Sequence, residues 1–404
     1  MAIIRPFAAL RPAPELASRI CELPYDVVST DEARALAAGN PLSFFHVSKP
    51  EIDLEPALDP YDPRVYARGA ENLRRLIREG AVRQDAEPCF YLYRQIMGEH
   101  VQTGLVAAAS CQDYLSNVIK RHELTRPDKE DDRVRHIEAL DAQTGPVFLA
   151  YQAPPALATF LAQKIAGPPA VDFVATDGVR HSSWTVSGAS DQEYIRGQLE
   201  KVDSVYIADG HHRCAAAARV FRSRQGRGNS PFFLAVLFPH DQLQILPYHR
   251  VLSDRNGLAP AQLLEKLESV FAIEPDGTAT PRRQHELGLF FEDHWRTLTF
   301  RPAFTATTDP LERLDVTLLQ RHVLAPVFGI DDPRTSHRIH FVGGIRGPRE
   351  LERLVRGSED ACAFSMFPTR IEDLMAIADG GRIMPPKSTW FEPKLRDAMF
   401  CHLL

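Results

Sequence analysis

The sequence predicts an α/β or mixed α+β protein, because short apolar runs alternate with helix-forming segments along the chain. Residues 202–221 show this best, with an apolar run, a glycine and then an alanine-rich block of strong helix formers. Residues 232–238 are entirely apolar, as in a strand that is buried on both faces. The alternation shows no internal period and no low-complexity tract. A chain of 404 residues is long enough for two or more lobes.

The first half of the chain is expected to contain two helices and a hairpin before the central motif. Residues 29–38 predict a helix capped by a hydroxyl side chain, and residues 66–80 predict an amphipathic helix. Residues 89–94 and 100–109 are typical of two strands joined by a tight turn. Residues 142–158, which include a glycine and paired prolines, are expected to be irregular.

The C-terminal part predicts one further βαβ unit. A strand and glycine turn over residues 341–347 precede a helix through Leu354 and an apolar strand over residues 361–367. Residues 381–388 imitate a phosphate-binding loop, but Pro386 stands where that loop needs its second glycine. Proline has no N–H group for a phosphate and cannot adopt a positive φ angle, so this segment is not a P-loop.

The central motif predicts an anion site. A strand that turns on Gly210 into a helix presents unpaired N–H groups and the positive end of the helix dipole, and Arg213 adds a planar cation suited to phosphate. Asp209 would repel a polyphosphate unless a cation such as magnesium lay between them. The alternative is structural: Asp209 caps the helix and pairs with Arg213, while His211 and His212 are ordinary turn residues.

A second candidate is the charged segment around Pro127. His122, Glu123 and Thr125 precede the expected helix, where a substrate or metal loop would lie, and Lys129 follows them. The segment lacks the second histidine of the His-Glu-x-x-His zinc signature, and Pro127 would break the helix that such a signature requires. A zinc protease is therefore not expected. The alternative is that the segment has no functional role and its charges lie on a solvent-exposed helix face.

Composition excludes several classes of protein. The formal net charge of −6 argues against nonspecific binding to nucleic acid. No apolar segment approaches the length of a membrane span and the start lacks the pattern of a signal peptide, so a cytoplasmic protein is expected. The six cysteines are scattered without a Cys-x-x-Cys pair, which indicates reduced and mostly buried thiols. Oligomeric state, a homo-oligomer included, is left open.

Two resemblances add to this interpretation. The Ala-Asp-Gly-His-His-Arg block at residues 208–213 resembles the Gly-x-His-Arg phosphate motif of the ParB and sulfiredoxin superfamily, whose members bind nucleotides and include kinases that act on free serine. Over its whole length the chain also resembles a large bacterial family of unknown function, DUF1015. The segments that carry this second resemblance are residues 5–7, 23–28, 40–47, 121–125, 385–389 and 390–394.

The resemblance implies a ParB/sulfiredoxin-like nucleotide-binding core over residues 1–255, with an inserted segment around residues 86–170 and a C-terminal α/β lobe over residues 256–404. It also implies a magnesium-dependent kinase that transfers phosphate from ATP or ADP to a free hydroxyl amino acid, with L-serine as the acceptor. In the serine kinases that the central motif resembles, an N-terminal acidic residue is the catalytic base.

Carried over to this chain, the resemblance makes Asp26 the base, with an Asx turn to Ser29 as the alternative. Asp209 would hold magnesium and take part in catalysis. Gly210 and the side chains of His211, His212 and Arg213 would hold the phosphates, and the two histidines would also be catalytic because they stabilise the charge that develops. The substrate would meet His122, Glu123, Thr125 and Lys129, and the nucleotide would also meet Lys387 and Ser388. For the last two residues a proline-stiffened surface turn is the alternative.

Other functions remain open. A nucleotide-dependent switch or DNA-associated factor would be expected to carry a basic recognition helix, and none stands out in the sequence. A nucleotide sensor would keep Gly210 and Arg213 but would need no base. A sulfiredoxin-like reductase is disfavoured because His211 occupies the position where its cysteine would stand, with Cys214 after the arginine.

Overall fold

The computed structural model describes residues 2–404 and divides them into two compact units. The first unit contains the chain up to Leu243 together with Pro393–Leu404. The second unit contains Gln244–Glu392. The sequence prediction placed one boundary after residue 255, whereas this division places a boundary after Leu243 and returns the last residues of the chain to the first unit.

The first unit is built on a nine-stranded mixed sheet, so the predicted α/β class is confirmed. Its strands pair mostly antiparallel, but β6 with β11 and β8 with β12 are parallel pairs. In spatial order the strands are β6 (Ile119–Lys120), β11 (Val205–Asp209), β8 (Val147–Tyr151), β12 (Phe232–Pro239), β5 (His100–Ser110), β4 (Phe90–Met97), β10 (Arg180–Val186) and β9 (Val171–Val174), and β1 (Ile4–Arg5) pairs with β5.

The structure confirms the predicted hairpin and corrects one segment. Strands β4 and β5 pair antiparallel, with Met97 opposite His100 across the turn. Residues 142–158, expected to be irregular, instead contain β7 (Ala142–Gln143), the fully buried strand β8 and the start of a helix at Pro155. The prediction was wrong because β8 is buried on both faces and so shows no alternation, while the second proline occupies the first turn of a helix, where proline is tolerated.

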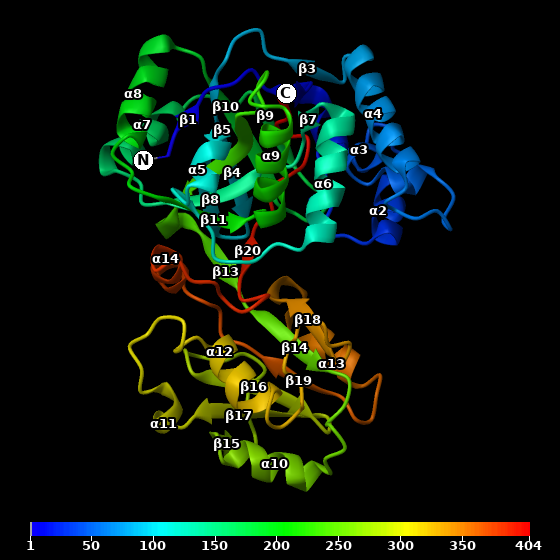
Figure 1. Cartoon of the computed structure of the whole chain (residues 1–404), viewed down its shortest axis with the longest axis vertical. Helices are drawn as coiled ribbons and strands as arrows, with labels where there is room; N and C mark the ends of the chain where they lie inside the picture. Colours follow the sequence, from blue (N-terminus) through cyan, green and yellow to red (C-terminus); the bar gives the residue numbers. More distant parts are fainter. Residues whose placement is uncertain (1) are drawn as a thin grey trace. The chain divides into compact units, whose positions relative to one another are not determined.

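Helices cover this sheet and extend the unit to one side, where α6 packs between α4 and α9 (Figure 1). The predicted helices near residues 29–38 and 66–80 are confirmed as α2 and α4, and α4 begins earlier because Asp62 caps it ahead of Pro63. The helices of this unit are α1 (Ala17–Ile20), α2 (Thr30–Ala37), α3 (Phe45–Ser48), α4 (Pro63–Arg78), α5 (Cys111–Leu115), α6 (Pro127–Leu140), α7 (Pro155–Lys164), α8 (Ala189–Leu199) and α9 (His211–Ser223).

The alanine block fixes α9 between the sheet and α6. Ala215, Ala217 and Ala218 belong to the main core, which also contains residues of β5, β8 and β12. Ala216 faces the other way and packs with Val220 against Ile137 of α6. Small side chains on both faces let α9 approach its two neighbours closely, so the residues at its N-terminus are held by a rigid element.

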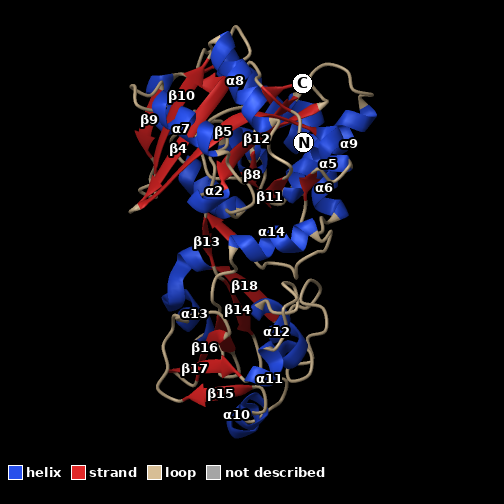
Figure 2. Cartoon of the chain, turned by 90° about the vertical axis from the view of Figure 1, so that its left-hand side faces the viewer, coloured by secondary structure: helices blue, strands red, loops and turns tan. Residues whose placement is uncertain are grey.

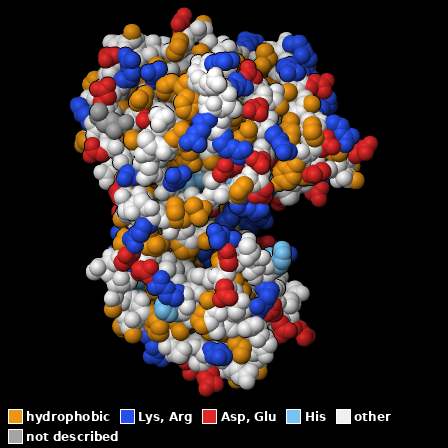
Figure 3. Space-filling view, viewed as in Figure 1, with side chains coloured by type: hydrophobic (Ala, Val, Ile, Leu, Met, Phe, Trp, Pro, Cys, Tyr) orange, Lys and Arg blue, Asp and Glu red, His pale blue; other side chains and the backbone are white. Residues whose placement is uncertain are grey.

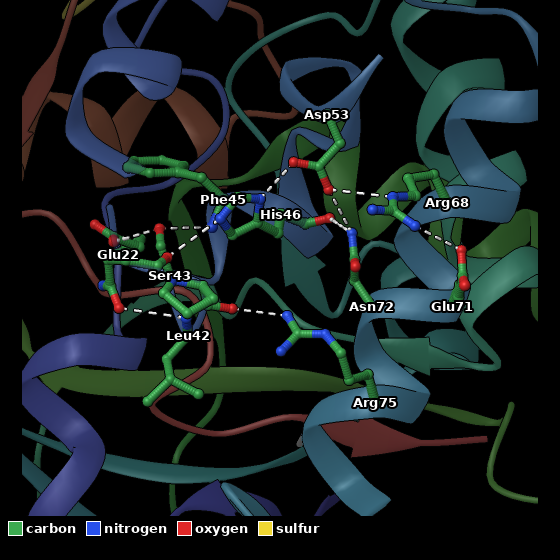
Figure 4. A network of polar contacts seen from close by, with 12 residues as sticks. Glu22, Leu42, Ser43, Phe45, His46, Asp53, Arg68, Glu71, Asn72 and Arg75 are labelled. Carbon is green, nitrogen blue, oxygen red and sulfur yellow. Dashed lines mark hydrogen bonds and ion pairs between the residues drawn. The ribbon is translucent and has the colours of Figure 1, made fainter. Parts of the chain in front are cut away.

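A network of partly buried polar contacts ties the N-terminal segment to α4 (Figure 4). The Asp53 carboxylate accepts hydrogen bonds from Asn72 at 2.8 Å and Arg68 at 3.3 Å, and it lies 2.6 Å from His46 Nδ1. The other nitrogen of His46 lies 3.2 Å from the Asn40 carbonyl oxygen. The His46 ring therefore lies between two acceptors, the Asp53 carboxylate and the Asn40 carbonyl oxygen.

Two small sheets complete the first unit. Strand β2 (Leu10–Pro12) pairs with β3 (Val82–Gln84), and β7 pairs with β21 (His402–Leu403). Near its end the chain also forms a bridge between Leu10 and Cys401. Pro393–Leu404 is therefore bound by backbone hydrogen bonds to elements from the first part of the chain.

The second unit has a six-stranded sheet, with α10 next to its edge strand β15 (Figure 2). Its order is β15 (Phe271–Glu274), β17 (His294–Phe300), β16 (Glu286–Phe291), β19 (Cys362–Ser365), β14 (Tyr248–Leu252) and β18 (Ile339–Gly343), and β13 (Gln244–Leu246) pairs with β20 (Trp390–Glu392). Its helices are α10 (Pro260–Glu268), α11 (Pro302–Thr305), α12 (Asp315–Leu319), α13 (Gly347–Val355) and α14 (Ile371–Asp379).

The predicted C-terminal βαβ unit is confirmed. Strands β18 and β19 are joined by α13, and both pair antiparallel with β14, so they run parallel to each other. The six cysteines are unpaired and buried, as expected. Within residues 2–404, no helix has both the length and the apolar character that crossing a membrane would require.

We expect Asp53→Asn to lower the free energy of unfolding by about 1–3 kcal/mol, because the new amide N–H groups would face the donors of Asn72 and Arg68. Burial opposes ionisation of Asp53, but hydrogen bonds from His46 and Asn72 and the charge of Arg68 still lower its pKa below 3.8. Its contribution is therefore present above that value and is lost as pH falls through the folded pKa.

Urea denaturation at neutral pH and in acid would measure both effects. Asp31→Asn is the control, because Asp31 is 94% exposed and pairs with Arg34 on the surface of α2. Equal stability of the two variants at neutral pH would contradict the assignment.

Candidate active site

The central motif folds as a strand, a glycine turn and a helix. Gly210 joins β11 to α9 with a φ of +99°, a conformation that residues with a side chain rarely adopt. A Cβ atom at this position would also lie 3.2 Å from the Arg213 guanidinium carbon. The amides of the first turn of α9, as in any helix, have no acceptor within the helix. Because no side chain caps them either, they can bind an anion.

Arg213 is the buried cation at the centre of this site. Its guanidinium donates to the Pro146 carbonyl and lies 3.6 Å from Asp26 and 3.7 Å from Asp209. Burial opposes its charge, but the two carboxylates outweigh burial and raise the Arg213 pKa further. Asp26 and Asp209, predicted from separate segments as base and metal ligand, therefore meet at one guanidinium.

Asp209 stands at the end of β11 between two cations. Its Oδ2 accepts a 3.0 Å hydrogen bond from Lys394, and its Oδ1 faces Arg213. Burial works against ionisation, yet the charges of Lys394 and Arg213 hold the pKa of Asp209 far below its ordinary range. Asp209 is therefore a permanent anion at neutral pH.

Asp26 lies in the turn closed by the Val27 N–H and the Pro24 carbonyl, 3.2 Å apart. Its side chain is 38% exposed, so it remains open to solvent while it pairs with Arg213. Ser29, the expected partner in an Asx turn, instead forms a capping box with Glu32 at the start of α2. The Asp26 carboxylate therefore pairs with Arg213 and not with Ser29.

The two adjacent histidines face different surroundings. His211 is buried, and its ring meets that of His122 edge to face at 4.5 Å. Burial and the neighbouring charge of His122 lower the pKa of His211 well below its ordinary value. His212 is half-buried, and its Nε2 accepts a 3.0 Å hydrogen bond from the backbone N–H of Arg126.

The predicted substrate residues precede and begin α6. His122 is buried beside His211, and Glu123 lies 4.0 Å from His211 Nδ1. Thr125 donates to Glu130 of α6, and Lys129 donates to the Tyr61 hydroxyl at 2.7 Å. The structure therefore brings His122 and Glu123 next to the central motif, while Thr125 and Lys129 have partners on α6 and near α4.

Lys387 and Ser388, the other predicted cofactor residues, belong to the second unit. The Lys387 ammonium lies over the ring of Tyr248, and its carbonyl accepts a 3.0 Å hydrogen bond from Arg250. Ser388 is buried and donates to the Pro385 carbonyl at 2.6 Å. Their cofactor role stays a prediction.

Residues from the end of the chain complete the site, and sequence reasoning missed them. Besides Lys394, these include Asp397, which is almost fully buried near Arg213. Burial raises the pKa of Asp397 to about 7, although Arg213 acts against that rise. Burial likewise raises the pKa of Glu22 to about 7, against a 2.6 Å hydrogen bond from Ser43 (Figure 4).

A weak signal for one missed residue was present. Lys394 ends the run of residues 390–394 that carries the family resemblance, but nothing in that run shows that it pairs with Asp209, 185 residues earlier. Asp397 lies outside every motif in the sequence. The assembled site combines an anion-binding helix start, a buried guanidinium and carboxylates of contrasting pKa, which suits acid–base chemistry on an anionic ligand.

We expect Gly210→Ala to lower the free energy of unfolding by about 1–3 kcal/mol, because an alanine at this φ is strained and its Cβ would press on Arg213. The matched control is Gly197→Ala in α8, where a Cβ would meet nothing within 4 Å. That change should leave stability equal or raise it by about 0.5–1 kcal/mol, since alanine is the better helix former. Urea unfolding of both variants tests this, and equal losses would refute it.

The raised pKa of Asp397 predicts a pH dependence of stability. Between the ordinary value of 3.8 and about 7 the folded protein holds a proton on Asp397 that the unfolded chain has released, so the contribution of Asp397 to stability falls as pH rises through this window. Asp397→Asn should remove this contribution from the pH profile, while Glu22 still contributes with the same sign and buried His122 with the opposite sign. The check is the urea midpoint as a function of pH, with exposed Asp203→Asn as control; an unchanged slope in Asp397→Asn would be the contrary result.

Comparison with known proteins gives distant likenesses in structure and one family match in sequence. SbnI with a C-terminal truncation from Staphylococcus aureus is 11% identical, with a TM-score of 0.40 over 72% of this chain and 85% of that chain. A conserved hypothetical protein from Pyrococcus furiosus is 14% identical, with a TM-score of 0.37 over 75% of this chain and 96% of that chain. A free serine kinase in complex with AMP is 14% identical, with a TM-score of 0.36 over 71% of this chain and 86% of that chain.

At these identities and scores the likenesses assign neither a ligand nor an activity. No curated protein matches the sequence significantly. The family model described as "Protein of unknown function (DUF1015)" matches residues 4–317, and the chain therefore belongs to that family.

Proposed function

We propose that this protein is a phosphotransferase that takes phosphate from a nucleotide, ATP or ADP, and gives it to the hydroxyl group of a small molecule. The observation that carries the proposal is the convergence of Asp26 and Asp209 on Arg213 beside an uncapped helix start. Phosphoryl transfer needs a base for the hydroxyl, cations around the phosphate and a rigid frame that holds both. This site offers each of these.

The phosphate end of the site is the turn at Gly210. Phosphate oxygens would accept hydrogen bonds from the first amides of α9 and would meet the positive end of its dipole. Arg213 supports this position from the same helix with a charge that its two carboxylates keep in place. Of the two histidines, His212 is the more exposed and the better placed to reach a ligand at the helix start.

Asp26 is the proposed base. Its carboxylate is partly exposed and faces Arg213, so it is available to a substrate hydroxyl. In the reaction the acceptor hydroxyl gives its proton to Asp26 while its oxygen forms the new bond to phosphorus. The bond between that phosphorus and the nucleotide then breaks, and the nucleotide leaves one phosphate shorter.

Magnesium, predicted at Asp209, would supply positive charge to the transferred phosphate. The donor chemistry fits in part: Asp209 is a permanent anion, but both its oxygens already face cations. A magnesium ion at Asp209 would therefore compete with Lys394 and Arg213 for the two carboxylate oxygens. Without the ion, Lys394 and Arg213 supply positive charge at the same carboxylate.

Free L-serine is the acceptor to be tested first, because the resemblance of the central motif to the serine kinases implies it. The loop of His122, Glu123 and Thr125 with Lys129 of α6 is the proposed substrate side of the site. On the face of the first unit seen in Figure 3, basic and acidic side chains are interspersed, which favours a small ligand over nucleic acid.

The test is mass spectrometry on the purified full chain incubated with magnesium, ATP or ADP, and a mixture of free amino acids and small alcohols. We expect one phosphorylated product, O-phosphoserine if the resemblance extends to the acceptor. Asp26→Asn should slow its formation by about 10²–10⁴-fold, the usual contribution of a general base. Asp203→Asn, an exposed aspartate in the loop before β11, should leave the rate unchanged.

The outcomes separate the candidate functions. Nucleotide binding that Arg213→Ala weakens, without any product, would replace the kinase by a nucleotide sensor or switch. Turnover that is equal in Asp26→Asn and wild type would remove Asp26 from the role of base. Turnover without magnesium would show that Lys394 and Arg213 supply the positive charge themselves.

A further inference from the structure

Two buried histidines and a glutamate from separate segments meet beside the central motif. His122 and Glu123 stand in the loop between β6 and α6, and His211 is the first residue of α9, 89 positions beyond His122. One possible ligand atom from each lies within 4.8 Å of the other two. We infer that these three side chains bind a divalent transition-metal ion of the zinc type. The inference goes beyond the proposed function and does not depend on it.

The His122 ring is oriented as a metal ligand would be. It is 2% exposed, and its Nδ1 is buried without a hydrogen-bond partner among the described residues. The Ile207 carbonyl accepts a hydrogen bond from the ring, which must come from the other nitrogen. Metal-bound histidines are typically held in this way, with one N–H on a backbone carbonyl and a free lone pair on the other nitrogen. A buried nitrogen without a partner is otherwise costly.

His211 supplies the second imidazole. Its ring is buried and stands at 89° to that of His122, with the ring centres 4.5 Å apart. Its Nδ1 faces Glu123 at 4.0 Å, while its Nε2 lies 3.5 Å from the His122 backbone nitrogen. Coordination through Nδ1 would place the ring proton on Nε2 and give up that last contact, which is long for a hydrogen bond.

Glu123 is the ligand that can move. Its side chain is 35% exposed, whereas both rings are fixed by burial. Bonds to zinc of about 2.0–2.2 Å require ligand atoms closer together than 4.8 Å, so the side chains must move closer to one another when the ion binds. Glu123, the most exposed of the three, has the most freedom to make this movement.

The types of ligand suit a cation. The site offers two imidazole rings, which bind metal ions in their neutral form, and one carboxylate. Imidazole nitrogens favour zinc over magnesium, which takes oxygen ligands. Three protein ligands leave a fourth position for water or a substrate atom.

The experiment measures metal binding by the full chain without nucleotide. Protein stripped with a chelator and dialysed is titrated with zinc chloride in a calorimeter, and we expect one ion per chain. Cobalt(II) chloride should give the visible absorption bands of a tetrahedral site with nitrogen ligands. Glu123→Gln should weaken zinc binding by at least about 10-fold, because replacing residues around a metal site usually lowers metal affinity by about that factor or more.

Glu99→Gln is the matched control, because Glu99 lies exposed in the turn between β4 and β5; its zinc affinity should equal that of wild type. His211→Ala, with folding checked by circular dichroism, should abolish the cobalt bands. Failure of wild type to bind zinc, or equal binding by Glu123→Gln and wild type, would overturn the inference. If wild type binds zinc but shows no kinase activity, only the proposed function is refuted.

Discussion

The buried guanidinium of Arg213 is the interaction on which the arrangement of the site depends. Removing a charge from water costs several kcal/mol per ion, and the fold must offset that cost with nearby anions and acceptors. Here they are the Pro146 carbonyl ahead of β8, the Asp26 turn and the end of β11 at Asp209. One cation thus fixes the relative positions of three segments that are far apart in the sequence.

The return of the chain's last residues to the first unit supplies the remaining charges. Pro393–Leu404 is bound by backbone contacts at Leu10 and through the pair of β21 and β7. This anchoring places Lys394 against Asp209 and Asp397 near Arg213. The segment therefore has both a structural and an electrostatic role, because the same backbone bonds that close the unit position two of the charges in its site.

Carboxylates in this region have opposite pKa shifts for identifiable reasons. Burial opposes the ionisation of Asp209, but the charges of Lys394 and Arg213 keep it ionised. In Asp397, burial outweighs the attraction of Arg213 and its proton is retained up to about pH 7. Environments that separate the pKa values of neighbouring acids are common in sites where protons move. Because their pKa values are shifted in opposite directions, the anion of Asp209 and the protonated acid of Asp397 both lie near the Arg213 guanidinium.

What could be predicted from the sequence was local. The turn at Gly210, the helix that follows it and the hairpin of β4 and β5 depend on residues a few positions apart, so composition and spacing were sufficient for them. Strand β8 was missed because a strand buried on both faces has no alternation to detect. Its burial is a property of the assembled sheet.

The contacts between residues of the site could not be predicted from the sequence. The charged loop at His122 lacked a second histidine in sequence, and α9 supplies His211 only after β6 and β11 pair. Asp26, Asp209 and Lys394 likewise meet through packing, since no local spacing relates them. The sequence by itself determined which residues could carry chemistry and the turn that presents them. The tertiary structure decided which of them meet, because burial and charge pairing act between segments that the sheet brings together.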